Sequence, residues 1–157
     1  MLILGIDPGF ERIGISILEK GKEEDALLYS DCFKTLSSLP FHERLGLIGK
    51  EIERVIKKYN PDTLAIETLF FNTNQKTALL VSEARGVILY EATLGNLKIY
   101  EYTPLQIKIA TTGYGRADKN QVNNMVKQLI VIEKEVKSDD EMDAIATAIT
   151  CSASYRA

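Results

Sequence analysis

The stretch LILGIDPG at residues 2–9 decides the fold of this chain. Its apolar part, LILGI, is typical of a strand that is buried on both faces. The DPG that follows it directly is a strong turn signal. Two further strands are expected over residues 13–18 and 26–33, each reached by a link of hairpin length. The N-terminal part is therefore predicted to be an antiparallel meander of three strands.

Beyond the meander, apolar residues recur at the three- and four-residue spacing of an amphipathic helix, over residues 40–59. The other expected elements are a strand at residues 63–66, a helix at 75–94, a strand at 97–102, and helices at 104–111, 118–130 and 139–154. Strands joined through helices run parallel, by right-handed crossovers. The sequence predicts an α/β fold with a mixed five-stranded sheet and helices on both faces. With the first strand central, the fourth strand lies beside it.

The composition is that of an ordinary globular chain. It has 157 residues with 45% apolar and 26% charged residues, which excludes disordered and collagen-like classes. One domain over residues 1–157 is expected at this length. No apolar run approaches the roughly 20 residues of a membrane span, and no leader peptide precedes the first strand. Cys32 and Cys151 match neither a disulfide framework nor a zinc site, so we expect small buried residues in a cytoplasmic protein.

Net charge misleads when it is taken over the whole chain. The total is −3, from 19 Lys and Arg against 22 Asp and Glu. Residues 1–67 hold 9 basic and 12 acidic residues, residues 68–132 hold 7 and 4, and residues 133–157 hold 3 and 6. The middle segment is therefore basic between two acidic ones. Because the local distribution sets the field that a polyanion meets, the total does not exclude a nucleic-acid partner.

Four acids are placed so that the fold can gather them. Asp7 and Glu67 each follow an apolar strand directly, where the ends of neighbouring strands meet. Asp140 and Asp143 are three residues apart, so they share one face near the start of the last helix. That face continues with small residues, which would let the helix approach the sheet closely: Ala144, Thr147 and Cys151. The pattern predicts a cluster of four carboxylates.

Four carboxylates cannot remain ionised side by side without a cation. Mg²⁺ or Mn²⁺ suits an all-oxygen site, and two ions about 4 Å apart can clamp the attacking and leaving oxygens of a phosphoryl displacement. No Ser–His or Cys–His nucleophile competes, since the only histidine is His42. The expected chemistry is phosphodiester hydrolysis.

Local structure offers another explanation for some of these acids. Asp7 before Pro-Gly can simply start a turn. Ser138 and Glu141 form a capping-box pattern, and acids such as Asp140 are favoured at a helix start by the helix dipole. Asp143 and Glu67 are harder to explain by local structure. Asp143 lies past the first helical turn, and Glu67 ends a buried strand, where unpaired charges are rare.

Five sequence blocks, in order, carry a family resemblance. They are GIDPG at residues 5–9, AIE at 65–67 followed by Phe70, Phe71 and Asn74, ARG at 84–86, GYGRADKNQV at 113–122, and DEMDA at 140–144. Together they closely resemble the RuvC family of bacterial Holliday-junction resolvases, which have a ribonuclease-H-like fold. The blocks cover nearly the whole chain, and five ordered matches are far more specific than a single Asp-Pro-Gly.

The resemblance implies a homodimeric endodeoxyribonuclease that acts on four-way junction DNA during recombination and repair. It would nick two opposed strands symmetrically and leave 5′-phosphate and 3′-hydroxyl ends. The residues that match the family's ligands are Asp7, Glu67, Asp140 and Asp143. They would hold two Mg²⁺ ions per active site, with Mn²⁺ as a substitute. Some members have His in place of Asp140. By the same resemblance, a branch-migration complex of RuvA and RuvB is a possible partner, and no membrane partner is expected.

Candidate DNA contacts lie in and beside the basic segment. Phe70 matches the family pattern and is expected to stack on a base. The alternative is that Phe70 and Phe71 pack into the hydrophobic core, as phenylalanine residues commonly do. Lys108 and Lys119 flank the Gly-Tyr-Gly loop and are expected to contact phosphate or stabilise transition-state charge, although scattered lysines are usually solvated. Arg85 supports either its own helix or a dimer contact.

Three other functions share part of this sequence pattern. A non-catalytic junction-binding module would not need the intact acid set. A nucleotide-binding member of the same broad fold needs a second phosphate loop in another lobe, for which 157 residues leave no room. A nuclease that cleaves RNA–DNA hybrids shares the acids but not the Gly-Tyr-Gly and Phe-Phe blocks. Cleavage of a four-way junction compared with a hybrid and a linear duplex separates these functions.

Overall fold

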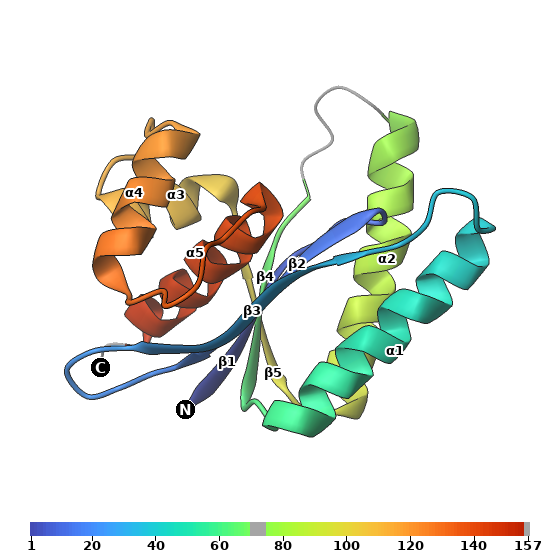
Figure 1. Ribbon diagram of the computed structural model, residues 1–157, viewed down its shortest axis with the longest axis horizontal. Coiled ribbons are helices and arrows are strands. Elements are labelled where there is room, and N and C mark those ends of the chain that lie inside the picture. The colour runs from blue at the N-terminus through green and yellow to red at the C-terminus, as the bar shows by residue number, and fades with distance from the viewer. Residues whose placement is uncertain (70–74, 156–157) are drawn as a thin grey trace.

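The computed structural model describes residues 1–69 and 75–155, which hold five strands and five helices (Figure 1). The strands are β1 (Leu2–Asp7), β2 (Arg12–Glu19), β3 (Ala26–Lys34), β4 (Thr63–Glu67) and β5 (Lys98–Tyr102). The helices are α1 (Phe41–Tyr59), α2 (Gln75–Leu94), α3 (Pro104–Thr112), α4 (Lys119–Leu129) and α5 (Asp139–Ser154). Each predicted element is present, with its ends within one residue of the prediction.

The five strands form one mixed sheet in the order β3-β2-β1-β4-β5. β1 pairs with β2, and β2 with β3, in antiparallel fashion, as hairpin links require. β1 pairs with β4, and β4 with β5, in parallel, because helices connect these strands. The predicted mixed sheet with β1 at its centre and β4 beside it is therefore confirmed.

Helices cover both faces of this sheet (Figure 1). α1 and α2 lie on one face, and α3, α4 and α5 lie on the other. Side chains of β1 alternate between the two layers: Leu4 and Ile6 pack with the α1–α2 layer, whereas Ile3 packs with the layer that contains α5. Both sides of β1 are buried, as its continuous apolar run predicts.

α5 approaches the sheet unusually closely. A Cβ atom added to Gly14 would lie 1.8 Å from the backbone oxygen of Asp140, and one added to Gly5 would lie 2.4 Å from that of Ala144. The hydroxyl of Ser16 donates a hydrogen bond to Ala144 O at 2.9 Å. Small residues on α5 and glycines on the strands therefore bring the start of this helix against β1 and β2, as its small-residue face predicts.

The cysteines behave differently from each other. Cys151 is buried in α5, as predicted, but Cys32 is only partly buried, so that expectation is wrong for Cys32. Cys32 pairs with Gly14 in the β2–β3 ladder, and its side chain reaches α5. Within residues 1–69 and 75–155, no helix is long and apolar enough to cross a membrane.

Candidate active site

Asp7 and Glu67 lie at the same edge of the sheet because their strands are parallel neighbours. Asp7 is the last residue of β1, and Glu67 is the last residue of β4. The register places Ile6 beside Ile66, and the acid of each strand is the next residue. Both carboxylates are therefore positioned by strand geometry, as the sequence predicts.

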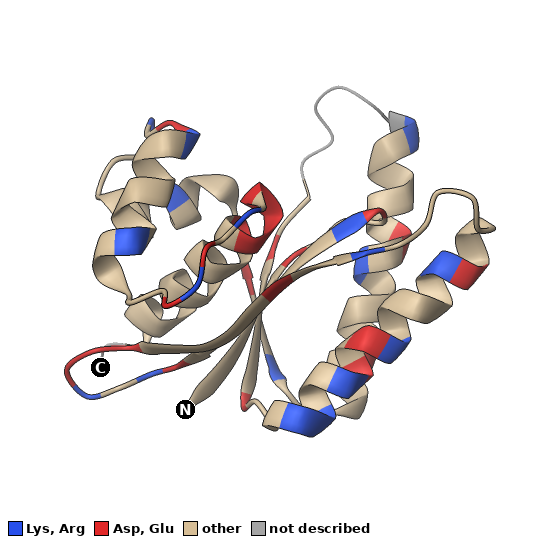
Figure 2. Cartoon of the chain, in the orientation of Figure 1, with Lys and Arg blue, Asp and Glu red and all other residues tan. Residues whose placement is uncertain are grey.

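Asp140 and Asp143 lie on the first turns of α5, which packs against β1 and β2 at this edge of the sheet. Gly14 is the residue of β2 that pairs with Asp7, and the backbone of Asp140 lies directly over Gly14. The close contact between α5 and the hairpin thus carries the helix acids to the strand acids. Figure 2 shows the acidic start of α5 beside the central strands.

The four acids interact strongly enough to change their proton affinities. The pKa of Asp7 is raised to about 8, first by burial and then by the negative charges of Asp143, Glu67 and Asp140. The pKa of Glu67 is raised to about 7, first by burial and then by Asp143. The Lys119 ammonium lowers both values without cancelling the increase. Close to neutral pH, the protein alone does not keep this cluster fully ionised.

A lysine of α4 faces the cluster. Lys119 Nζ lies 3.0 Å from Asp143 Oδ2 and 3.5 Å from Asp139 Oδ2. Burial nevertheless raises the pKa of Asp143, although Lys119 opposes it. Lys119 therefore supplies one positive charge at the edge of a group that holds several negative charges.

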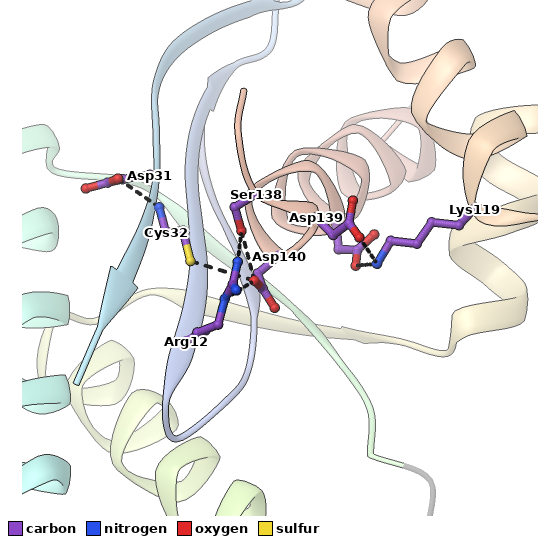
Figure 3. A network of polar contacts seen from close by, with 8 residues as sticks. Arg12, Asp31, Cys32, Lys119, Ser138, Asp139 and Asp140 are labelled. Atoms are coloured by element: carbon purple, nitrogen blue, oxygen red, sulfur yellow. Dashed lines mark hydrogen bonds and ion pairs between the residues drawn. The ribbon is translucent and has the colours of Figure 1, made fainter. Parts of the chain in front are cut away.

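Asp140 has a different environment from the other three acids (Figure 3). Its Oδ2 accepts hydrogen bonds from Arg12 Nε at 2.8 Å and from Ser138 Oγ at 2.8 Å. The Cys32 thiol lies 3.7 Å from the same oxygen. Burial raises the pKa of Asp140, but the Ser138 hydrogen bond and the Arg12 charge outweigh it, so its pKa is lowered. Asp140 is therefore the one acid of the four whose pKa is lowered, whereas the pKa values of Asp7, Glu67 and Asp143 are raised.

The donor set fits a divalent metal ion by its chemistry. Four carboxylates supply oxygen ligands, and two of them, Asp7 and Glu67, have pKa values raised to about 8 and 7, first by burial and then by the neighbouring acids. Over the described part of the chain, no three His, Cys, Asp or Glu side chains are grouped closely enough to hold one ion as they stand. The side chains of Asp140 and Asp143 are instead directed toward Arg12 and Lys119.

A cavity of about 250 Å³ opens beside the acids. Its polar wall contains Glu67, Asp143, Lys108 and Lys119, and its apolar wall is formed by Pro104, Ile107 and Val122. The structure thus places Lys108 and Lys119 in the wall of the same cavity as two of the four acids. Figure 2 shows further basic residues on the α3–α4 side of the molecule. Phe70 and Phe71 lie outside the described residues.

The structure gives three residues near the site roles that the sequence does not predict: Ser138, Arg12 and Arg85. The capping box expected at Ser138 and Glu141 is wrong: Ser138 is the N-cap of α5, but its side chain makes no capping hydrogen bond. The sequence patterns described above do not identify Arg12 as a site residue. Its position does offer a signal for the site, because it is a charged residue at the start of an apolar strand, just after the Asp7 turn. Arg85 donates to the backbone oxygen of Glu67 at 3.3 Å and so supports the end of β4.

The sheet order, the helices on both faces and the acids at the strand ends define a ribonuclease-H-like protein. The family model described as crossover junction endodeoxyribonuclease RuvC matches residues 3–151 of this chain. The chain belongs to the RuvC family.

Individual relatives agree with this assignment. The crossover junction endodeoxyribonuclease RuvC of Alkaliphilus oremlandii is 50% identical over 149 residues, which cover 95% of this chain and 91% of the relative. That of Halothermothrix orenii is 47% identical over 156 residues, covering 99% and 94% of the two chains. A solved structure of T. thermophilus RuvC in complex with a Holliday junction substrate matches with a TM-score of 0.89 at 32% identity. It covers 96% of this chain and 92% of that one.

Proposed function

We propose that this chain is a structure-selective endodeoxyribonuclease that resolves Holliday junctions in homologous recombination and DNA repair. It places symmetric nicks in two opposed strands of a four-way junction and leaves 5′-phosphate and 3′-hydroxyl ends. The observation that carries the proposal is the convergence of Asp7, Glu67, Asp140 and Asp143 at one edge of the sheet. The names of the relatives, and the Holliday junction bound to T. thermophilus RuvC, support it.

The four acids are proposed as the ligands of two Mg²⁺ ions, for which Mn²⁺ would substitute. When bound, such ions stabilise charge on the attacking and leaving oxygens of a phosphodiester. The raised pKa values of Asp7 and Glu67 support this role, because a cation bound close to the two carboxylates would favour their charged forms and so offset the cost of ionising them. Asp7 and Glu67 fix the site from the sheet, and Asp140 and Asp143 close it from α5.

Lys108 and Lys119 are proposed to hold the DNA backbone and the charge that develops on the phosphate. Both line the cavity beside Glu67 and Asp143, which is where an anionic substrate must approach acids that repel it. Basic groups at this position offset that repulsion and orient the phosphate. Phe70, which directly follows the described residues 1–69, is proposed as a base-stacking residue.

We also propose that the protein acts as a homodimer in the cytoplasm, since two symmetric nicks need two active sites. α2 supports a dimer, because Leu79, Tyr90 and Leu94 lie on one face of this helix and are 60%, 61% and 60% exposed. A stable dimer would bury such a face. A branch-migration complex of the RuvA and RuvB type is proposed as a further partner.

The test compares wild type with Asp7→Asn in a four-way junction nicking assay with Mg²⁺. We expect Asp7→Asn to abolish cleavage while junction binding is largely retained, because the amide keeps the shape of the side chain but not its charge. Asp25→Asn, in the turn between β2 and β3, is the matched control and should cleave normally. Nicking by Asp7→Asn would refute the metal assignment, and equal rates on junction, hybrid and linear duplex would refute junction selectivity.

A further inference from the structure

Three side chains converge on a single oxygen of Asp140 (Figure 3). Arg12 Nε and Ser138 Oγ both donate to Asp140 Oδ2 at 2.8 Å, and Cys32 Sγ lies 3.7 Å from it. Arg12 also donates from Nη2 to Ser138 Oγ at 2.9 Å, so its guanidinium holds both neighbours at once. None of these contacts uses the other carboxylate oxygen, Oδ1.

The hydroxyl of Ser138 does not cap α5, although Ser138 is the N-cap residue of this helix. A serine at an N-cap normally accepts a hydrogen bond from the first turn of the helix, which stabilises the helix by about 1 kcal/mol. Ser138 makes no such bond and donates to Asp140 instead. Its expected partner in the capping box, Glu141, is buried and accepts from Ser30 Oγ at 2.7 Å, with Lys134 Nζ at 2.6 Å. The start of α5 is thus anchored by other elements, and Ser138 is free to hold the acid.

Fixing one oxygen determines the orientation of the whole carboxylate. A carboxylate that binds a metal ion through one oxygen commonly has its other oxygen held by hydrogen bonds, which orient it and limit its rotation. A guanidinium that forks between Asp140 and Ser138 provides this restraint better than a single point charge would. The restraint spans distant parts of the chain, because Arg12 begins β2 whereas Ser138 and Asp140 begin α5.

We propose that Arg12 and Ser138 are positioning residues that fix the Asp140 carboxylate through Oδ2, so that Oδ1 is presented for metal binding. This inference rests on the proposed function, in which Asp140 is a metal ligand. Arg12 and Ser138 bind neither the metal nor the DNA in this role: they act through Asp140. The alternative is an ordinary half-exposed ion pair, which would contribute little and would not depend on the hydroxyl of Ser138.

The first test measures Mn²⁺ binding by isothermal titration calorimetry on the full chain without DNA. We expect Ser138→Ala to weaken the binding of at least one ion by about tenfold, whereas Ser138→Thr keeps the hydroxyl and the affinity. Thermal unfolding of the metal-free protein should show that Ser138→Ala stays folded and loses only the contribution of its hydrogen bonds with Arg12 and Asp140, because no capping bond is lost. Ser138→Gly serves as a second variant, since glycine is accepted at N-caps. Ser154→Ala, at the far end of α5, is the matched control.

The second test replaces the guanidinium without removing its charge. Arg12→Lys cannot bind Asp140 and Ser138 together, so we expect Mn²⁺ affinity to fall by about tenfold although the net charge is unchanged. Arg54→Lys is the matched control, because Arg54 pairs with Glu51 on α1, on the other face of the sheet. Unchanged Mn²⁺ affinity in both Ser138→Ala and Arg12→Lys overturns the inference.

Asp140→Asn separates this inference from the proposed function. If Asp140→Asn weakens Mn²⁺ binding while Arg12→Lys and Ser138→Ala do not, the positioning role is wrong and the metal site stands. If Asp140→Asn leaves every Mn²⁺ affinity unchanged, Asp140 is not a ligand, and both the assignment of this ligand and the positioning role are overturned. Loss of affinity in all three variants, with normal binding by the control variants, supports both.

Discussion

The two acids on the strands and the two acids on the helix meet at one site but experience different surroundings. Asp7 and Glu67 end buried strands, and burial is the largest cause of their raised pKa values of about 8 and 7. Each helix acid instead faces a cation of the protein itself: Asp140 faces Arg12 at 2.8 Å, and Asp143 faces Lys119 at 3.0 Å. The same functional group is thus held in two ways.

This difference follows from where each element ends. Asp7 and Glu67 end neighbouring strands near the start of α5, where their carboxylates are partly withdrawn from water. The first turns of α5 are reached by side chains from β2 and α4. Within the described part of the chain, Asp7 and Glu67 therefore have no directly paired cation, whereas Asp140 and Asp143 each pair with a basic side chain of the protein, although burial still raises the pKa of Asp143.

The largest effect should come from forcing α5 away from the sheet. In Gly14→Ala the new Cβ would lie 1.8 Å from Asp140 O, so the backbone of α5 or β2 must shift. We expect the free energy of unfolding to fall by about 3 kcal/mol, together with loss of nicking, because the helix acids leave the strand acids. Denaturant unfolding and the junction assay measure the two effects.

Gly46→Ala is the control for this substitution. A Cβ at Gly46 on α1 meets nothing within 4 Å, so alanine should stabilise the helix by up to about 1 kcal/mol. A Gly14→Ala protein as stable and active as wild type would show that the close approach of α5 is not needed to join the two pairs.

The second prediction concerns pH. The folded-state pKa values of Asp7 and Glu67 lie above the unfolded value of about 4, so the folded protein binds more protons between about pH 4 and pH 8. Their contribution to stability is present below pH 4 and is lost as the pH rises through 7 and 8. The metal-free protein should become less stable over this range, and Asp7→Asn should be more stable than wild type at pH 8 by roughly 2 kcal/mol.

Asp140→Asn is expected to change the stability at pH 8 in the opposite direction to Asp7→Asn. Because its hydrogen bonds and Arg12 lower the pKa of Asp140, its ionised form stabilises the fold, and that contribution is lost only as the pH falls through its lowered folded-state value. Asp140→Asn should therefore be less stable than wild type at pH 8. If Asp7→Asn and Asp140→Asn change stability in the same direction there, the contrast between strand and helix acids does not hold.

The smallest effect should follow from removing the cation on α4. Lys119 lowers the pKa of both strand acids, but its side chain is 51% exposed, so solvent screens much of its charge. We expect Lys119→Gln to lower the stability of the metal-free protein at pH 8 by less than about 1 kcal/mol and to steepen its pH dependence. Lys127→Gln, on the same helix, should leave the thermal unfolding curve of wild type unchanged at each pH.

Much of the architecture follows from local sequence signals. The run at residues 2–6 predicts a buried central strand, and hairpin-length links predict the antiparallel half of the sheet; both are confirmed. The positions of Asp7 and Glu67 could also be anticipated, because an acid that follows directly on each of two neighbouring parallel strands must reach the same edge. The i, i+3 spacing of Asp140 and Asp143 likewise needs only helix periodicity.

What these signals could not supply is the set of partners of each acid. Arg12 and Asp140 are 128 residues apart, and only the packing of α5 against Gly5 and Gly14 brings them into contact. The pattern at Ser138 and Glu141 predicts a cap from local chemistry alone, whereas the fold offers both side chains closer partners.

Local sequence patterns predict the order of the elements, the central strand and the placement of the four acids, because periodicity and turn chemistry depend on residues a few positions apart. How far each acid is withdrawn from water, which acid faces a cation and how Asp140 is oriented follow only from the folded structure. Those properties depend on burial and on contacts between residues distant along the chain, and they arise only once α5 has packed onto the sheet.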